Sequence, residues 1–158
     1  MNVIFLDVDG VLNYTNWYYS DRNPGNLNGE EDVDPQCIER VNKLCEETNS
    51  EIILSSDWRI DDSAFSRLER AGLKKILDKT PIPVFGNYGA TYHFTRGEEI
   101  QMWLEWHPEV TNYVIIDDRT DFMDNQKSHF VHVDSYYGFT DEDYNLALTI
   151  LKSGCPNG

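Results

Sequence analysis

The sequence contains few basic residues. Its 158 residues include 13 lysines and arginines against 28 aspartates and glutamates, which gives a formal net charge of −15 at pH 7. Because nonspecific binding to nucleic acids depends on contacts from Lys and Arg to phosphates, we expect no strong nonspecific nucleic-acid binding. The same charge still allows a few arginines to recognise a nucleic-acid end locally.

Long apolar segments and cysteines are also scarce. The longest apolar runs hold about five residues, whereas a helix that spans a membrane needs about 20, so we expect no membrane span. The chain opens without a basic segment followed by an apolar one, so we expect no secretory signal. Three cysteines, Cys37, Cys45 and Cys155, lack the spacing of metal ligands. They favour reduced thiols and a cytoplasmic location.

The composition and the order of predicted elements indicate one α/β domain over residues 1–158. Hydrophobic residues make up 40% of the chain and aromatic residues 13%, as is typical of a globular protein. Strands that alternate with helices predict a Rossmann-like three-layer sandwich with a central parallel sheet. The predicted strands are 3–6, 51–55, 113–117 and 130–133, and the predicted helices are 34–48, 61–70, 96–106 and one from Thr140, with a short helical turn at 73–77.

Two carboxylates, Asp7 and Asp9, follow the first predicted strand and precede Gly10. The carboxyl ends of parallel strands are where open α/β sheets bind their ligands. Two like charges placed there are costly unless a divalent cation neutralises them. Taken alone, the pattern also fits a strand that ends in a solvated acidic turn.

A second apolar strand ends in paired carboxylates, Asp117 and Asp118, and Asp121 follows four residues after the first of them. Carboxylate oxygens are hard ligands of the kind that Mg²⁺ prefers. A solvated acidic turn is again the alternative for this segment by itself. Two such strand ends in one small chain favour a shared metal site over two unrelated turns.

These strand ends resemble the motifs of the haloacid dehalogenase superfamily, and the run from Asp7 to Val11 resembles its nucleophile motif. The resemblance implies that Asp7 attacks phosphorus to form an aspartyl-phosphate and that Asp9 is the general acid and base. It also implies that Mg²⁺ binds to the Asp7 carboxylate, the Asp9 backbone carbonyl and Asp117. Asp118 is then either a further ligand or a residue that contacts a ligand without binding the metal. An acid at Asp9 favours a phosphatase over a dehalogenase.

The resemblance extends to two further motifs. The run from Ile53 to Arg59 is similar to the second motif, in which a hydroxyl at a strand end binds the phosphoryl oxygens. Ser55 is the expected hydroxyl and Ser56 the alternative, although both could instead cap the following helix. The planar guanidinium of Arg59 could bind the same phosphoryl oxygens through two hydrogen bonds. Arg96 occupies the place of the family's third-motif cation, with a surface arginine as the alternative reading and Lys79 as a remote substitute.

Residues 13–34 are predicted to form a flap, or minimal cap, over the site, because they are rich in Asn, Gly, Pro and aromatics. Trp17, Tyr18, Tyr19 and Arg22 are candidate substrate contacts, and packing of the loop onto the domain is an equally good reading. A large cap has no room here. The site is therefore expected to be open and suited to a bulky substrate such as a polynucleotide end or a phosphoprotein, unless a partner subunit in an oligomer completes it.

The four histidines point away from zinc chemistry. His93, His107, His129 and His132 lack ligand spacing, so we expect structural or surface roles for them. The sequence thus predicts an Mg²⁺-dependent phosphomonoester hydrolase, with the run from Ser55 to Arg59 similar to the phosphatase-type domains of RNA-repair proteins. The alternatives are a phosphatase of small metabolites or nucleotides and a non-catalytic binding or regulatory domain of the same fold.

Overall fold

The computed structural model describes residues 1–25, 33–83 and 94–153. Residues 26–32 of the predicted flap, His93 and Cys155 therefore lie outside the described residues. The elements are β1 (Asn2–Leu6), α1 (Thr15–Tyr18), α2 (Pro35–Thr48), β2 (Ser50–Leu54), the 3₁₀ helix η1 (Asp57–Ile60), α3 (Ala64–Arg70), β3 (Ile76–Lys79), α4 (Arg96–Trp106), β4 (Asn112–Asp117), the 3₁₀ helix η2 (Asp124–His129), β5 (Phe130–His132) and α5 (Asp141–Lys152).

Five strands form one sheet in the order β3-β2-β1-β4-β5, and every pairing is parallel. The first strand of the chain therefore lies at the centre, with β2 on one side and β4 on the other. This arrangement confirms the predicted α/β fold with a central parallel sheet. It also brings the carboxyl ends of β1, β2 and β4 to the same edge.

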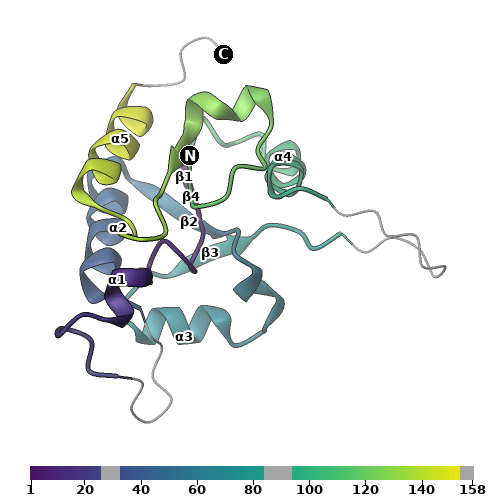
Figure 1. Ribbon diagram of the computed structural model, residues 1–158. Coiled ribbons are helices and arrows are strands. Elements are labelled where there is room, and N and C mark those ends of the chain that lie inside the picture. The colour runs from purple at the N-terminus through teal and green to yellow at the C-terminus, as the bar shows by residue number, and fades with distance from the viewer. Residues whose placement is uncertain (26–32, 84–93, 154–158) are drawn as a thin grey trace.

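The two faces of the sheet bury alternate residues of β1. Ile4 and Leu6 belong to the core that contains α2 and α5, while Val3 and Phe5 belong to a second core beneath α4. Side chains two residues apart on a strand share a face, so this division follows from the pleat. Helices thus cover both faces of the sheet, as Figure 1 shows for α2 and α5 on one face and α4 on the other.

The sequence predictions failed at three kinds of element. The helical turn predicted at 73–77 is wrong, because Ile76–Lys79 form the edge strand β3. Leu73, Ile76 and Leu77 have helical spacing, but pairing with β2 decides the conformation. The short helix α1 lies within the predicted loop, and neither 3₁₀ helix was predicted.

Among the described helices, none combines the length and hydropathy needed to cross a lipid bilayer.

Candidate active site

The ends of three neighbouring strands place Asp7, Ser55 and Asp117 side by side. The N–H of Asp7 donates to the carbonyl of Ile116 at 3.1 Å, and the N–H of Ser55 donates to the carbonyl of Leu6 at 3.0 Å. Each of the three residues lies two positions beyond a side chain packed under α4, so all three are expected on the α4 face of the sheet. The sheet therefore builds a polar row next to the first turn of α4.

Three carboxylates converge at this edge, from Asp7, Asp117 and Asp118. One oxygen from each lies within 4.8 Å of the other two, close enough to hold one cation. Asp7 is 3% exposed and Asp117 is fully buried. Gly10 has a φ of +84°, and a Cβ at this position would clash with Oδ2 of Asp118, so only glycine lets that carboxylate approach. The predicted convergence of distant carboxylates is present, although their roles as ligands stay predictions.

Burial disfavours the ionised forms of Asp7 and Asp117. It raises the pKa of Asp7 far above the ordinary carboxyl range, and the negative charge of Asp117 raises this pKa further. Burial also raises the pKa of Asp117, while the Arg96 guanidinium acts against that rise. A divalent cation at this edge would reverse the balance, because its charge favours the ionised form of every carboxylate around it.

Arg96, at the first position of α4, supplies a permanent positive charge to the cluster. It is 4% exposed, and its Nη1 lies 3.2 Å from Oδ1 of Asp7 and 2.8 Å from Oδ2 of Asp117. Nη2 lies 3.4 Å from Asp57, while Nε has no hydrogen-bond partner among the described residues. Arg96 thus neutralises part of the cluster and keeps one buried donor for a further acceptor, while phosphate binding by Arg96 stays a prediction.

The first turn of α4 is fixed from several sides. Thr95 and Glu98 form a capping box, in which each side chain accepts the backbone N–H of the other. Oδ2 of Asp121 accepts the backbone N–H of Arg96 at 3.0 Å. A Cβ on Gly97 would lie 2.8 Å from Cα of Phe122, so a glycine permits this close packing. Asp121, a less certain metal ligand in the sequence, therefore caps the helix that carries Arg96.

The two serines after β2 have different surroundings. Oγ of Ser56 accepts the backbone N–H of Trp58 at 3.2 Å and so caps η1. Oγ of Ser55 is fully buried and has no hydrogen-bond partner among the described residues. A buried hydroxyl without a partner is costly unless a ligand or water satisfies it. The geometry therefore favours Ser55 over Ser56 as the hydroxyl that contacts a phosphoryl group.

Arg59, the other predicted phosphate ligand, is 2% exposed and has all five of its N–H groups directed at protein oxygens. These acceptors are the carbonyls of Ser55, Ser56, Thr80 and Pro81 and Oε2 of Glu99, the last at 2.6 Å. No donor is left for a phosphate, which argues against the predicted contact. Arg59 instead ties together the segments that follow β2 and β3. Lys79, which donates to the carbonyl of Arg59, belongs to the same structure.

Asp9 is exposed, but its carboxylate is held by two side chains. Nδ2 of Asn13 donates to Oδ1 at 3.0 Å, and Nε1 of Trp58 donates to Oδ2 at 3.1 Å. The cluster of described carboxylates within 4.8 Å of one another does not include Asp9, and the predicted metal contact of Asp9 is through its backbone carbonyl. Neither Asn13 nor Trp58 was predicted as a site residue. Trp58 stands within the quoted second motif, whereas no signal in the sequence singles out Asn13.

The described part of the flap is anchored on the domain. Trp17 is 2% exposed, and the guanidinium of Arg22 lies over its ring while donating to both carboxylate oxygens of Asp34. Packing therefore accounts for Trp17 and Arg22, the alternative that the sequence left open. Tyr18 and Tyr19 are 50% and 86% exposed, so substrate contact stays a prediction for them.

Three of the four histidines lie in the described part of the chain and contact backbone carbonyls. Nδ1 of His107 lies 2.7 Å from the Trp103 carbonyl, and Nδ1 of His129 lies 2.8 Å from that of Tyr113. Nε2 of His132 lies 3.1 Å from the carbonyl of Asp118. These contacts agree with the structural roles that were predicted for the histidines.

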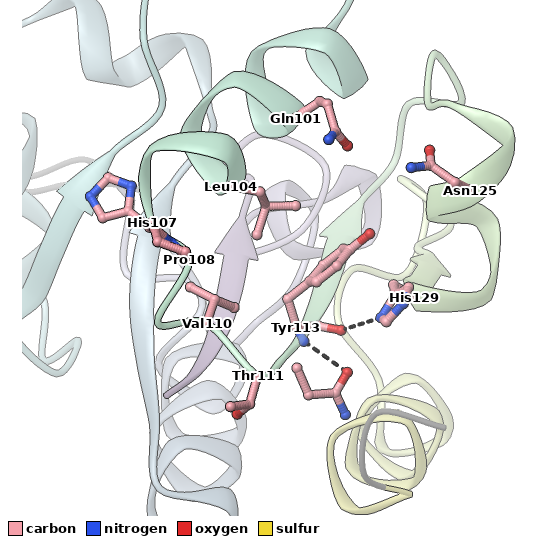
Figure 2. Close-up of a pocket in the computed structure, with 10 residues that line it drawn as sticks. Gln101, Leu104, His107, Pro108, Val110, Thr111, Tyr113, Asn125 and His129 are labelled. Carbon is pink, nitrogen blue, oxygen red and sulfur yellow. Dashed lines mark hydrogen bonds between the residues drawn. The ribbon is translucent and has the colours of Figure 1, made fainter. Parts of the chain in front are cut away.

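His107 and His129 line a hollow of about 290 Å³ at the amino end of β4. Figure 2 shows Tyr113 in this hollow with His129 beside it, and the two rings stack with centroids 3.9 Å apart. The hollow lies at the opposite end of β4 from Asp117 and contains none of the predicted site residues.

Comparison of the sequence with known protein families agrees with the carboxylates found at the strand ends. Residues 3–144, most of the chain, match the family described as the HAD domain in Swiss Army Knife RNA repair proteins. The chain belongs to this family. No curated protein and no solved structure matches the sequence significantly. Membership of the HAD family confirms the resemblance found in the sequence and supports a hydrolase of the haloacid dehalogenase type.

Proposed function

We propose that this HAD domain is an Mg²⁺-dependent phosphomonoester hydrolase that works through an aspartyl-phosphate intermediate. The observation that carries the proposal is the convergence of Asp7, Asp117 and Asp118, with Arg96 within ion-pair distance of the first two. Phosphate monoesters react extremely slowly with water, so their hydrolysis needs both a covalent route and strong neutralisation of charge. The strand-end cluster contains the groups for both.

Asp7, Asp117 and Asp118 fit a magnesium ion because they offer three oxygen ligands within reach of one position. The backbone carbonyl of Asp9 is a fourth candidate ligand. When bound, Mg²⁺ supplies positive charge next to the transferring phosphoryl oxygens and favours ionisation of the carboxylates. The raised pKa of Asp7 supports this role, since the nucleophile must be ionised to react and a nearby cation favours that form.

The covalent step forms a bond between an Asp7 oxygen and phosphorus while the bond from phosphorus to the leaving alcohol breaks. Asp9 gives its proton to the leaving oxygen and then removes a proton from the water that attacks the aspartyl-phosphate. This second step releases inorganic phosphate and restores the Asp7 carboxylate. Oγ of Ser55 and Nε of Arg96, both buried donors without a partner in the described chain, hold the phosphoryl oxygens.

The substrate is a phosphorylated molecule whose size an open site would tolerate. A nucleic-acid end is the favoured substrate, because the family is described by its occurrence in RNA repair proteins. Any such recognition must be local, since a net charge of −15 opposes wide contact with a polyanion. A phosphatase of small metabolites or nucleotides is the second candidate, and a non-catalytic binding domain the third. A cytoplasmic location and an oligomer in which a partner completes the site belong to the same proposal.

Release of p-nitrophenolate from p-nitrophenyl phosphate tests the reaction, with and without Mg²⁺ and with Asp7→Asn as the control. We expect release that depends on both the metal and Asp7, and equal release from wild type and Asp7→Asn would favour the binding domain. A panel of 3′- and 5′-phosphorylated oligonucleotides, nucleotides and sugar phosphates then tests the substrate. Rates on the oligonucleotides no higher than on the small phosphates would exclude the nucleic-acid end.

A further inference from the structure

We infer that Trp58 and Asn13 are positioning residues that hold the acid–base carboxylate Asp9 in its working orientation. The inference rests on the proposed function, because it concerns how Asp9 reaches the leaving oxygen. It adds two residues that neither the strand-end pattern nor the family motif assigns to the reaction. Their two donors meet the two oxygens of one carboxylate, at 3.0 Å from Asn13 and 3.1 Å from Trp58.

The amide of Asn13 has a defined orientation. Its Oδ1 accepts the backbone N–H of Gly10 at 2.9 Å, so Nδ2 is the atom that faces Asp9. Asn13 is 4% exposed, and the N–H groups of Val11 and Leu12 both donate to the carbonyl of Val8 in the turn between Asp9 and Asn13. The first donor to Asp9 is therefore built into the turn that follows β1.

The indole of Trp58 comes from a different strand end and is also fixed. Its backbone N–H donates to Oγ of Ser56, and the guanidinium of Arg67 lies 4.7 Å from the centre of its ring. Arg67 in turn pairs with Asp61 at 3.4 Å, and the N–H of Asp61 donates to the carbonyl of Trp58. The second donor to Asp9 therefore belongs to the segment after β2, which also carries Ser55.

The two hydrogen bonds from Asn13 and Trp58 form a clamp on Asp9. This clamp leaves Asp9 able to carry a proton. An ionised carboxylate offers about four acceptor positions, and the two donors occupy two of them. The remaining positions can hold the proton that moves to the leaving oxygen, while the plane of the carboxyl group stays fixed. A fixed acid removes the need to orient the side chain during the reaction, which is the usual advantage of a preorganised group.

The clamp predicts that its loss will affect poor leaving groups most. An alkoxide needs a proton as it leaves, whereas p-nitrophenolate leaves with little help from an acid. Trp58→Phe keeps a ring for Arg67 and removes the N–H donor. We expect it to lower kcat on an alkyl phosphate such as glycerol phosphate by about tenfold, and to change KM and the rate of the first-turnover burst of p-nitrophenolate by less than about threefold. Asn13→Ala should act in the same direction, and Trp106→Phe, which alters an exposed residue at the end of α4, is the matched control.

Combination with Asp9→Asn separates positioning from a general structural effect. If Trp58 acts through Asp9, adding Trp58→Phe to Asp9→Asn should not lower the burst of p-nitrophenolate from the first turnover any further. A further loss in that background, or a first-turnover burst of p-nitrophenolate that Trp58→Phe slows as much as it slows kcat on the alkyl phosphate, would overturn the inference. A wild-type protein that hydrolyses no monoester would overturn the proposed function and this inference with it, whereas normal turnover by both Trp58→Phe and Asn13→Ala would overturn the inference alone.

Discussion

Two arginines are buried beside the candidate site, and their surroundings differ in kind. Arg59 directs its donors at four backbone carbonyls and one carboxylate, Glu99. Arg96 faces the carboxylates of Asp7 and Asp117 and keeps Nε without a partner in the described chain. The same planar fork can thus join segments of backbone or supply charge to a reaction. The acceptors around a buried arginine decide which of these two roles it has. Four experiments test whether Arg96 acts in the reaction and Arg59 in stability.

Replacement of Arg96 should have the largest effect on activity. We expect Arg96→Ala to lower kcat by about 10²–10³-fold at saturating Mg²⁺, because the charge nearest the attacking carboxylate is lost. Steady-state hydrolysis of p-nitrophenyl phosphate measures this effect. An Arg96→Ala protein with close to wild-type kcat would remove the difference between the two arginines.

Replacement of Arg59 should instead lower stability. We expect Arg59→Met to reduce the free energy of unfolding by about 3–5 kcal/mol, because it removes the donor to four backbone carbonyls and the partner of Glu99, whose side chain is only 13% exposed. Chemical denaturation measures this change, and kcat measured where the variant is folded should remain near that of wild type. Adding Glu99→Gln should recover part of the loss. A large fall in kcat at unchanged stability would instead assign Arg59 to phosphate binding.

Magnesium should stabilise the protein through Asp7 and Asp117, the carboxylates that pair with Arg96. The stabilisation should become stronger as the pH rises. The pKa values of Asp7 and Asp117 are raised in the folded protein. Their contribution to stability is therefore present below the ordinary carboxyl pKa of about 4 and is lost as the pH rises towards the raised values. Mg²⁺ binds the ionised form, so saturation at 100 times Kd should restore about 2.7 kcal/mol near pH 8 and much less near pH 5.

Thermal unfolding with and without Mg²⁺ at the two pH values measures this difference. Asp117→Asn removes one of the three clustered carboxylates and should remove most of the stabilisation by magnesium at pH 8. Glu99→Gln, which changes the carboxylate beside Arg59, should leave it intact. A magnesium effect that is the same at pH 5 and pH 8 in the wild-type protein would contradict metal binding to the buried carboxylates.

The two serines should give the smallest effects, divided in the same way as the arginines. We expect Ser55→Ala to lower kcat about tenfold, equivalent to about 1.4 kcal/mol, through the loss of one donor to the phosphoryl group. Ser56→Ala should lower the free energy of unfolding by about 1 kcal/mol through the loss of the η1 cap, with kcat unchanged. The reverse pattern would make Ser56 the hydroxyl of the reaction.

The sheet and the carboxylates could be predicted because their signals are local. An apolar run that ends in Asp7, or in Asp117 and Asp118, carries both the strand and its terminal chemistry within a few residues. Parallel pairing then makes the convergence of such ends a consequence of the fold class. The short edge strand β3 was missed because its conformation comes from its neighbour β2.

The role of Arg59 could not be predicted, because its acceptors include Thr80, Pro81 and Glu99, which are distant in the chain. Sequence patterns describe what a side chain can donate and not what lies beside it. The clamp on Asp9 has the same origin. Asn13 is four residues from Asp9, but Trp58 reaches it only because β1 and β2 are neighbours.

The central place of β1 has a consequence for heating. Backbone hydrogen bonds tie β1 to β2 on one flank and to β4 on the other, and Val3 to Leu6 are shielded from water. Fraying begins at peripheral segments, so the amide protons of this strand should exchange with solvent only through whole-molecule opening. The nucleophile at its tip should then keep its geometry until the melting transition itself, and thermal inactivation should coincide with cooperative denaturation.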